Sequence, residues 1–197
     1  LEPDLIIAYP YSRGTLTTLE PKIPVYYVGY EKSFSDVIRG IRVMGAIMGK
    51  AGEAEKIVAN IQSRVEWITS QTNKLDEASK PLVYYETSTL PGRCPGPNTF
   101  GDELIRKAGG INICADKPLD YPTLSSEYII EKNPDVILIV WYGQSVTDVK
   151  SRSGWESIEA VKNNRVHKLS RISCAGPRVW MVLEEVAKLL HPEIFGG

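Results

Sequence analysis

The most constraining feature of this sequence is a junction that occurs twice. Residues 3–8 read Pro-Asp-Leu-Ile-Ile-Ala, and residues 134–139 read Pro-Asp-Val-Ile-Leu-Ile. Proline has no amide hydrogen and moves the preceding residue out of the right-handed helical region, so each junction ends any helix before it. The branched run that follows has no polar alternation, which is typical of a strand buried on both faces of a parallel sheet. The two junctions predict two α/β units built on one plan.

Strand and helix patterns alternate along the rest of the chain, which predicts parallel sheets and an α/β fold class. After the first strand, at 5–8, the pattern predicts further strands at 24–28, 82–85, 111–114, 136–141 and 165–169. It predicts helices that begin after Ser33 or Ser35, at 53–73, at 100–108, from Ser125 or Ser126 to 131, at 155–162, and at 179–190 with Pro177 as the first helical residue.

The helix predicted at 53–73 is long enough to connect two lobes. Its apolar residues recur at helical spacing, and at ~1.5 Å per residue it would extend about 30 Å, the diameter of a small domain. We therefore expect this helix to act as a stiff connector.

Composition excludes several classes of function. The net charge is −1 and there is no basic run, so nucleic acid is not an expected partner. No stretch is long and apolar enough to cross a membrane. The three cysteines lack C-x-x-C spacing, and His167 and His191 are the only histidines, so we expect no zinc or iron–sulfur site.

Six segments together resemble the class III substrate-binding proteins of ABC importers, which bind ferric siderophores, haem or cobalamin. They follow the family's order and cover nearly the whole chain: the opening L-x-P-D-L-I-I-A with the later V-x-Y strand and long helix, Phe100–Asn112, Leu124–Ile137, Trp155–Val166, Gly176–Arg178, and the closing H-P-E-I-F.

The resemblance implies two Rossmann-like lobes with parallel sheets, bridged by a long helix. Family members begin earlier, so the chain is expected to be truncated at its amino end. Residues 1–34 would be a remnant of the amino-terminal lobe, 35–78 the connecting helices, and 79–197 the carboxy-terminal lobe. A lobe as small as residues 1–34 is marginal, so we expect it to dimerise or exchange strands with a second copy, or to be poorly ordered.

The resemblance also implies a function without catalysis or a resident cofactor. The protein would bind an iron complex (a ferric siderophore or haem) or cobalamin in the cleft between the lobes and deliver it to an ABC permease in the membrane. It would be periplasmic or extracellular, either free or as a membrane-anchored lipoprotein. The alternative is a chelatase-like or nitrogenase-like cofactor-handling enzyme on the same bilobal scaffold.

Loops beyond the carboxyl ends of strands are where α/β folds bind ligands. In the first lobe they hold Tyr9, Tyr11 and Arg13, and then Tyr30. Tyrosine rings offer flat apolar surface, phenolates are hard oxygen ligands for Fe(III), and a guanidinium suits an anionic chelate. The alternative interpretation is a solvated loop.

In the second lobe the same reasoning selects Arg93 and Asn98, in a loop too long for a simple connection, with Trp141, Tyr142 and Arg171. Trp141 as a core residue is the competing interpretation. Cys94 and Cys174 both fall in cleft-side loops. They either form a disulfide in an extracytoplasmic setting or, as cysteines more often do, serve as buried apolar residues.

Glu127 is the residue that the resemblance selects for docking. In families like this one, a surface glutamate early in the helix before each Pro-Asp strand pairs with arginines of the permease. The other interpretation is a first-turn glutamate favoured by the helix dipole, and the two are compatible.

Overall fold

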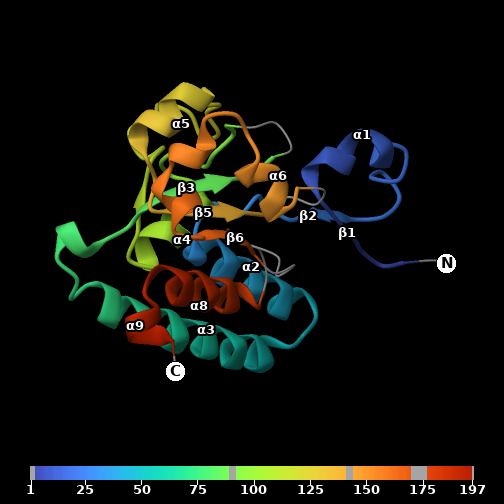
Figure 1. Ribbon diagram of the computed structural model, residues 1–197. Coiled ribbons are helices and arrows are strands. Elements are labelled where there is room, and N and C mark those ends of the chain that lie inside the picture. The colour runs from blue at the N-terminus through green and yellow to red at the C-terminus, as the bar shows by residue number, and fades with distance from the viewer. Residues whose placement is uncertain (1–2, 89–91, 141–143, 170–176, 197) are drawn as a thin grey trace. The chain divides into compact units, whose positions relative to one another are not determined.

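The computed structural model describes residues 3–88, 92–140, 144–169 and 177–196 (Figure 1). Contacts divide the chain into two units, Leu1–Glu31 and Lys32–Gly197. Each unit contains one sheet, and every strand pair in the two sheets is parallel. The predicted α/β class and parallel strands are confirmed.

The first unit is a small two-stranded sheet. Strands β1 (Ile6–Ala8) and β2 (Val25–Tyr27) are connected by a 3-10 turn, η1 (Pro10–Ser12), and one helical turn, α1 (Arg13–Leu16). None of its described residues is fully buried, and Ile7 is 47% exposed. The prediction that the first junction leads into a strand buried on both faces is therefore wrong. A unit of two strands and two short turns has too few apolar side chains to enclose one.

The second unit contains a four-stranded sheet in the order β4-β3-β5-β6. Its strands are β3 (Leu82–Glu86), β4 (Ile111–Asn112), β5 (Val136–Ile139) and β6 (Val166–Lys168). All four residues of β5 are fully buried, as the Pro-Asp junction predicts for this strand.

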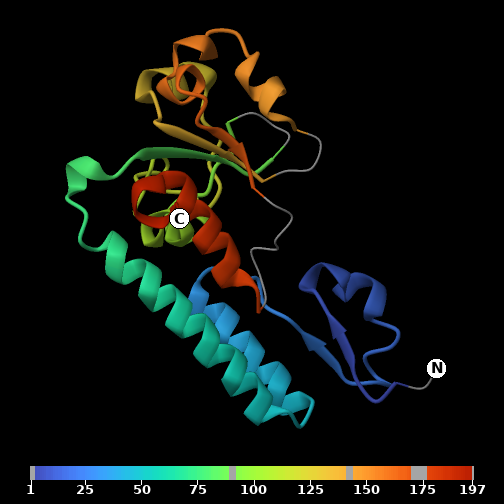
Figure 2. The same ribbon diagram turned by 60° about the horizontal axis from the view of Figure 1, so that its bottom comes forward.

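Helices cover both faces of this sheet (Figure 1). On one face Val83, Tyr85, Val136 and Leu138 contribute to a core cluster with helices α2 (Phe34–Ile47), α3 (Ala51–Thr72), α4 (Phe100–Lys107), α8 (Val179–Leu190) and α9 (Pro192–Phe195). The long helix α3 lies beside α2, as Figure 2 shows.

The opposite face carries a second core cluster. Tyr84, Ile137 and Ile139 pack there with residues of α5 (Ser126–Lys132), α6 (Val146–Lys150), η3 (Trp155–Ser157) and α7 (Glu159–Lys162). Trp155 is fully buried in this cluster. The sheet is thus the middle layer of three.

Several helix boundaries differ from the sequence predictions. Helix α8 begins at Val179 after an Arg178 N-cap, so Pro177 is not its first helical residue, and Pro192 instead begins the short helix α9. The single helix predicted at 155–162 is two turns, η3 and α7, because Ile158 between them is extended. Helix α6 and the turn η2 (Glu77–Ser79) were not predicted.

The helices at 34–72 fall in the second unit together with the four-stranded sheet. Their role as a bridge to a first lobe, and the predicted boundaries at 34 and 78, stay predictions.

Candidate functional site

The connections of the second sheet define where a ligand-binding crevice forms. The chain leaves β3 through α4, on one face, to reach β4 at one side, and it leaves β5 through α6 and α7, on the other face, to reach β6 at the other side. Where two neighbouring parallel strands send their connections to opposite faces, the loops separate at the strands' carboxyl ends. In this unit that point lies between β3 and β5.

A buried ion pair occupies the carboxyl end of β3. Glu86 is fully buried, and both of its carboxylate oxygens accept hydrogen bonds from the Arg152 guanidinium, at 2.6 and 2.7 Å. The Tyr84 hydroxyl donates to Glu86 Oε2 at 2.7 Å. Burial and the neighbouring Glu86 carboxylate raise the pKa of Tyr84, so this hydroxyl stays protonated and remains a donor.

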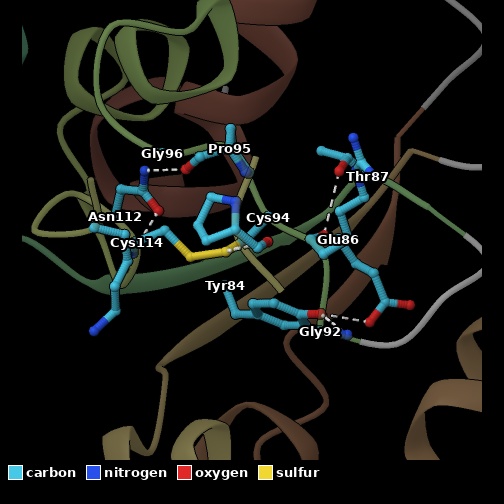
Figure 3. The surroundings of a disulfide bond; sticks show 12 residues. Tyr84, Glu86, Thr87, Gly92, Cys94, Pro95, Gly96, Asn112 and Cys114 are labelled. Atoms are coloured by element: carbon cyan, nitrogen blue, oxygen red, sulfur yellow. Dashed lines mark hydrogen bonds between the residues drawn. A yellow bond between two sulfur atoms is a disulfide. The ribbon is translucent and has the colours of Figure 1, made fainter. Parts of the chain in front are cut away.

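The loop after β3 is built into the protein by a disulfide bond between Cys94 and Cys114, with 6.6 Å between their α-carbons (Figure 3). The predicted alternative pairing of Cys94 with Cys174 is therefore wrong. Cys114 closely follows β4, which pairs with β3, and Cys94 lies in the loop that follows β3.

Backbone hydrogen bonds complete the anchoring of this loop. The amides of Cys94 and Gly96 donate to the carbonyls of Pro122 and Asp120, at 3.1 and 2.8 Å, and the Leu124 amide donates to the Gly92 carbonyl at 3.0 Å. A β-carbon on Gly92 would lie 2.0 Å from the Leu124 carbonyl oxygen, so only glycine fits at this crossing. The loop at 92–99 is therefore anchored along its length rather than solvated.

Arg93 and Asn98 are the exposed members of this loop. The backbone of Arg93 forms an isolated antiparallel β-bridge with that of Thr123. The Arg93 guanidinium lies 5.6 Å from the centre of the Tyr121 ring. Asn98 has a left-handed backbone, with φ of 62°, directly before the Thr99 cap of α4. Both side chains face solvent while the backbone around them is fixed.

The remaining ligand-side candidates of the second lobe, Trp141, Tyr142 and Arg171, lie outside the described residues, as does Cys174. In the sequence Trp141 and Tyr142 come after β5, and Arg171 comes after β6. Gln144, the first described residue after the gap at 141–143, is buried, and its Oε1 has no hydrogen-bond partner among the described residues.

In the first unit the structure brings two of the predicted aromatic residues together. The rings of Tyr9 and Tyr11 stack with centroids 5.6 Å apart and 9° between their planes. Both are exposed, Tyr11 to 74%. Tyr30, after β2, is also exposed, and because β1 and β2 are parallel it follows the same edge of the sheet.

Arg13 has a partner of its own in this unit. Its guanidinium lies 4.6 Å from the centre of the Tyr27 ring. The Tyr27 hydroxyl donates to Glu20 at 2.5 Å, and this hydrogen bond, together with burial, raises the pKa of Tyr27. The strand pattern gives no indication of these contacts of Tyr27 with Arg13 and Glu20.

Glu127 lies exposed in the first turn of α5, as predicted. Ser125 caps this helix, since its hydroxyl accepts a hydrogen bond from the Tyr128 amide at 3.2 Å. The Glu127 backbone amide and the Ser125 hydroxyl hold the pKa of Glu127 below its usual range. The carboxylate is therefore charged and available on the surface at neutral pH.

No group of three or more histidine, cysteine, aspartate or glutamate side chains suited to a metal ion occurs in the part of the chain that the structure describes. Likewise, none of the described helices is both long and apolar enough to cross a bilayer.

Sequence reasoning missed the Glu86–Arg152 pair and the partner of Cys94. A charged residue at the end of an apolar strand is a weak signal for a buried carboxylate, and nothing local indicates its partner 66 residues away. Three cysteines permit three pairings, and the sequence does not distinguish them.

Comparison with known proteins gives consistent results. Over 203 residues the chain is 28% identical to an uncharacterized ABC transporter substrate-binding lipoprotein of Bacillus subtilis, a match that spans 99% of this chain and 64% of the relative. Over 142 residues it is 34% identical to a cobalamin-binding protein of Halobacterium salinarum, spanning 70% of this chain and 38% of that protein. The chain therefore matches less than two thirds of the length of either relative.

Among solved structures, a periplasmic solute binding protein from Veillonella parvula superposes with a TM-score of 0.79 at 25% identity, covering 98% of this chain and 61% of that chain. These relatives are named as binding proteins, which argues against the enzyme alternative. The family model described as "Periplasmic binding protein" matches residues 1–171. With the parallel α/β units described above, this match shows that the chain belongs to the periplasmic binding protein family.

Proposed function

We propose that this protein is the extracytoplasmic substrate-binding component of an ABC importer for a metal chelate of the ferric siderophore, haem or cobalamin class. The observation that carries the proposal is the family match over residues 1–171, supported by relatives named as an ABC substrate-binding lipoprotein and a cobalamin-binding protein.

The stacked pair of Tyr9 and Tyr11 supports a large, flat ligand. Two nearly parallel exposed rings present apolar surface against which a macrocycle or a catecholate can stack. With Arg13 they make the edge beyond β1 suited to a flat chelate with anionic groups.

In the second unit the proposed contacts are Arg93 and Asn98 on the anchored loop, with Trp141, Tyr142 and Arg171 beyond β5 and β6. In the first unit Tyr30 is a further proposed contact, with Tyr9, Tyr11 and Arg13. The switch point between β3 and β5 supports this choice, because α/β sheets bind ligands at such points. A cleft between the units, which the family resemblance implies, stays a prediction.

The disulfide supports the proposed location. Disulfides persist in oxidising compartments outside the cytoplasm and are rare inside it. A buried bond between Cys94 and Cys114 is therefore consistent with a protein that works in the periplasm or on the outer surface of the cell.

Glu127 is the proposed contact with the permease, and its exposed carboxylate would pair with a basic residue of that partner. Such a surface pair acts on recognition and association rather than on ligand affinity. Ligand binding and docking should then separate by mutation.

The test uses the full-length protein, titrated with hydroxocobalamin, haemin and a ferric siderophore by fluorescence quenching, with uptake measured alongside. Trp141→Ala should weaken binding of the recognised chelate by about fivefold or more, since a stacked aromatic is worth on the order of 1 kcal/mol. Glu127→Ala should leave that affinity unchanged and lower uptake. Failure of all three chelates to bind would overturn the proposal, and loss of binding in Glu127→Ala alone would show that the two roles are assigned to the wrong faces.

A further inference from the structure

The proposed ligand-side residue Arg93 and the proposed docking residue Glu127 belong to adjoining segments. Arg93 pairs with Thr123, and the Leu124 amide donates to the Gly92 carbonyl at 3.0 Å. Ser125, the next residue, is the N-cap of α5, and Glu127 lies in that helix's first turn. A shift of the loop would thus act directly on the start of the docking helix.

A second connection between the same two segments runs through the buried ion pair. The Gly92 amide donates to the Tyr84 hydroxyl at 2.9 Å, and that hydroxyl donates to Glu86 (Figure 3). Glu86 in turn accepts both hydrogen bonds from Arg152. The loop is therefore tied to Arg152 through two intermediate side chains.

Arg152 continues the connection to α5. Its guanidinium lies 4.5 Å from the centre of the Trp155 ring, and the Trp155 indole nitrogen donates to Ser126 Oγ at 2.6 Å. Ser126 directly precedes Glu127. The chain of contacts from Gly92 thus ends one residue before the proposed docking carboxylate.

The charge of Glu86 makes Arg152 necessary to this arrangement. A fully buried carboxylate without a partner is strongly unfavourable, whereas the bidentate guanidinium neutralises it and fixes its direction. Arg152 itself is mostly buried, so solvent offers it little alternative hydration.

We infer that Arg152 is a positioning residue that holds the loop at 92–96 and the first turn of α5 in one rigid arrangement, so that the ligand-side loop and the docking face respond together. The roles of the loop at 92–96 in ligand binding and of α5 in docking rest on the proposed function, but the physical connection between the two segments does not.

Hydrogen exchange of the intact protein, measured by mass spectrometry without ligand or permease, tests this connection. Arg152→Met should speed exchange at least about tenfold in peptides covering both 92–96 and 126–130, because it leaves Glu86 unpaired. Peptides from α3 and α8 should be unchanged. Arg152→Lys should restore part of the protection, since it keeps the charge but loses the fork.

Arg42→Met is the matched control, because Arg42 also forms a two-bond pair, with Glu55, but on the exposed surface of α2 and α3. It should leave both peptides unchanged. Where Arg152→Met does not fold, Tyr84→Phe removes only the hydroxyl between Gly92 and Glu86 and should still speed exchange at 92–96 and 126–130.

Faster exchange at 92–96 with no change at 126–130 would overturn the inference, as would equal acceleration in α3 and α8, which would show a general loss of stability. Coupled exchange in a protein whose Glu127→Ala variant transports normally would leave the inference standing and contradict the docking role instead.

Discussion

The two Pro-Asp junctions have nearly the same sequence and very different surroundings. The strand after Pro134-Asp135 is fully buried, with Ile137 at 0% exposure, whereas the strand after Pro3-Asp4 leaves Ile7 47% exposed. Both form parallel strands, so the local pattern decides strand formation in each. The difference teaches that an aliphatic run encodes a strand, but its burial depends on how many layers the rest of the unit supplies.

In the second unit the layers come from sequence far from the strand. Ile137 and Ile139 pack under α5, α6 and α7, while Val136 and Leu138 face the helices of the other cluster. The first unit has no fully buried residue among those described. The strand after the second junction should therefore contribute much more to the free energy of unfolding than the strand after the first.

The strongest test of this comparison is to truncate one isoleucine in each of the two strands. Ile137→Ala should lower the free energy of unfolding by about 3–4 kcal/mol, because it removes buried methyl groups and leaves a cavity. Ile7→Ala should change it by no more than about 0.5 kcal/mol. Urea unfolding followed by circular dichroism measures both, and similar losses in the two variants would contradict the description of the first strand.

The disulfide should be the next largest difference, since residues 1–31 contain no cysteine. Replacing Cys94 and Cys114 together by serine should lower the free energy of unfolding by about 3 kcal/mol, because the bond closes a loop of 20 residues. Dithiothreitol should lower the melting temperature of the unmodified protein and leave that of the double variant unchanged. A double variant as stable as the unmodified protein would show that the bond adds nothing to the fold.

A smaller difference in the free energy of unfolding is expected between substitutions of two serine N-caps. Ser145 begins α6 with a reciprocal capping box, in which its hydroxyl accepts from the Asp148 amide and its amide donates to the Asp148 carboxylate. Ser12 begins α1 without a side-chain cap. Ser145→Ala should cost about 1 kcal/mol, and Ser12→Ala close to nothing.

The same capping box gives a dependence on pH. The Ser145 amide and hydroxyl hold the pKa of Asp148 below its usual range, so the carboxylate's contribution is complete above the unfolded value of about 3.9 and is lost as the pH falls through the lowered value. The difference between Ser145→Ala and the unmodified protein should shrink in strong acid. A difference that stays constant down to full protonation would show that the Ser145 hydroxyl does not help to hold the Asp148 carboxylate in its charged form.

Local patterns predicted the elements whose signals lie within a few residues. The strands after the Pro-Asp junctions and the long helix α3 are confirmed, and of the two candidate serines at each helix start the structure uses Ser33 and Ser125. Helix α6 was missed although Ser145-Val-Thr-Asp148 is a capping-box pattern, because the helix is too short for an apolar stripe. Pro177 was misplaced because a proline can precede a helix without being its first residue.

The candidate site was predictable only in outline. The rule that ligands lie beyond strand carboxyl ends selected Tyr9 and Tyr11, which the structure stacks, and Arg93, which it holds on an anchored loop. It gave no indication that Arg13 contacts Tyr27 or that Glu86 carries a buried charge. Those contacts depend on neighbours that only folding brings together.

The sequence by itself determined the order of strands and helices, the parallel α/β class and the resemblance to substrate-binding proteins, because each follows from short-range patterns or from their order along the chain. The tertiary structure alone decided which strand is buried, that Cys94 pairs with Cys114, and that Arg152 neutralises Glu86. The reason is physical: burial, disulfide pairing and ion pairing are set by distances between residues that lie 20 to 66 positions apart, and those distances exist only once the sheet and its two layers of helices have formed.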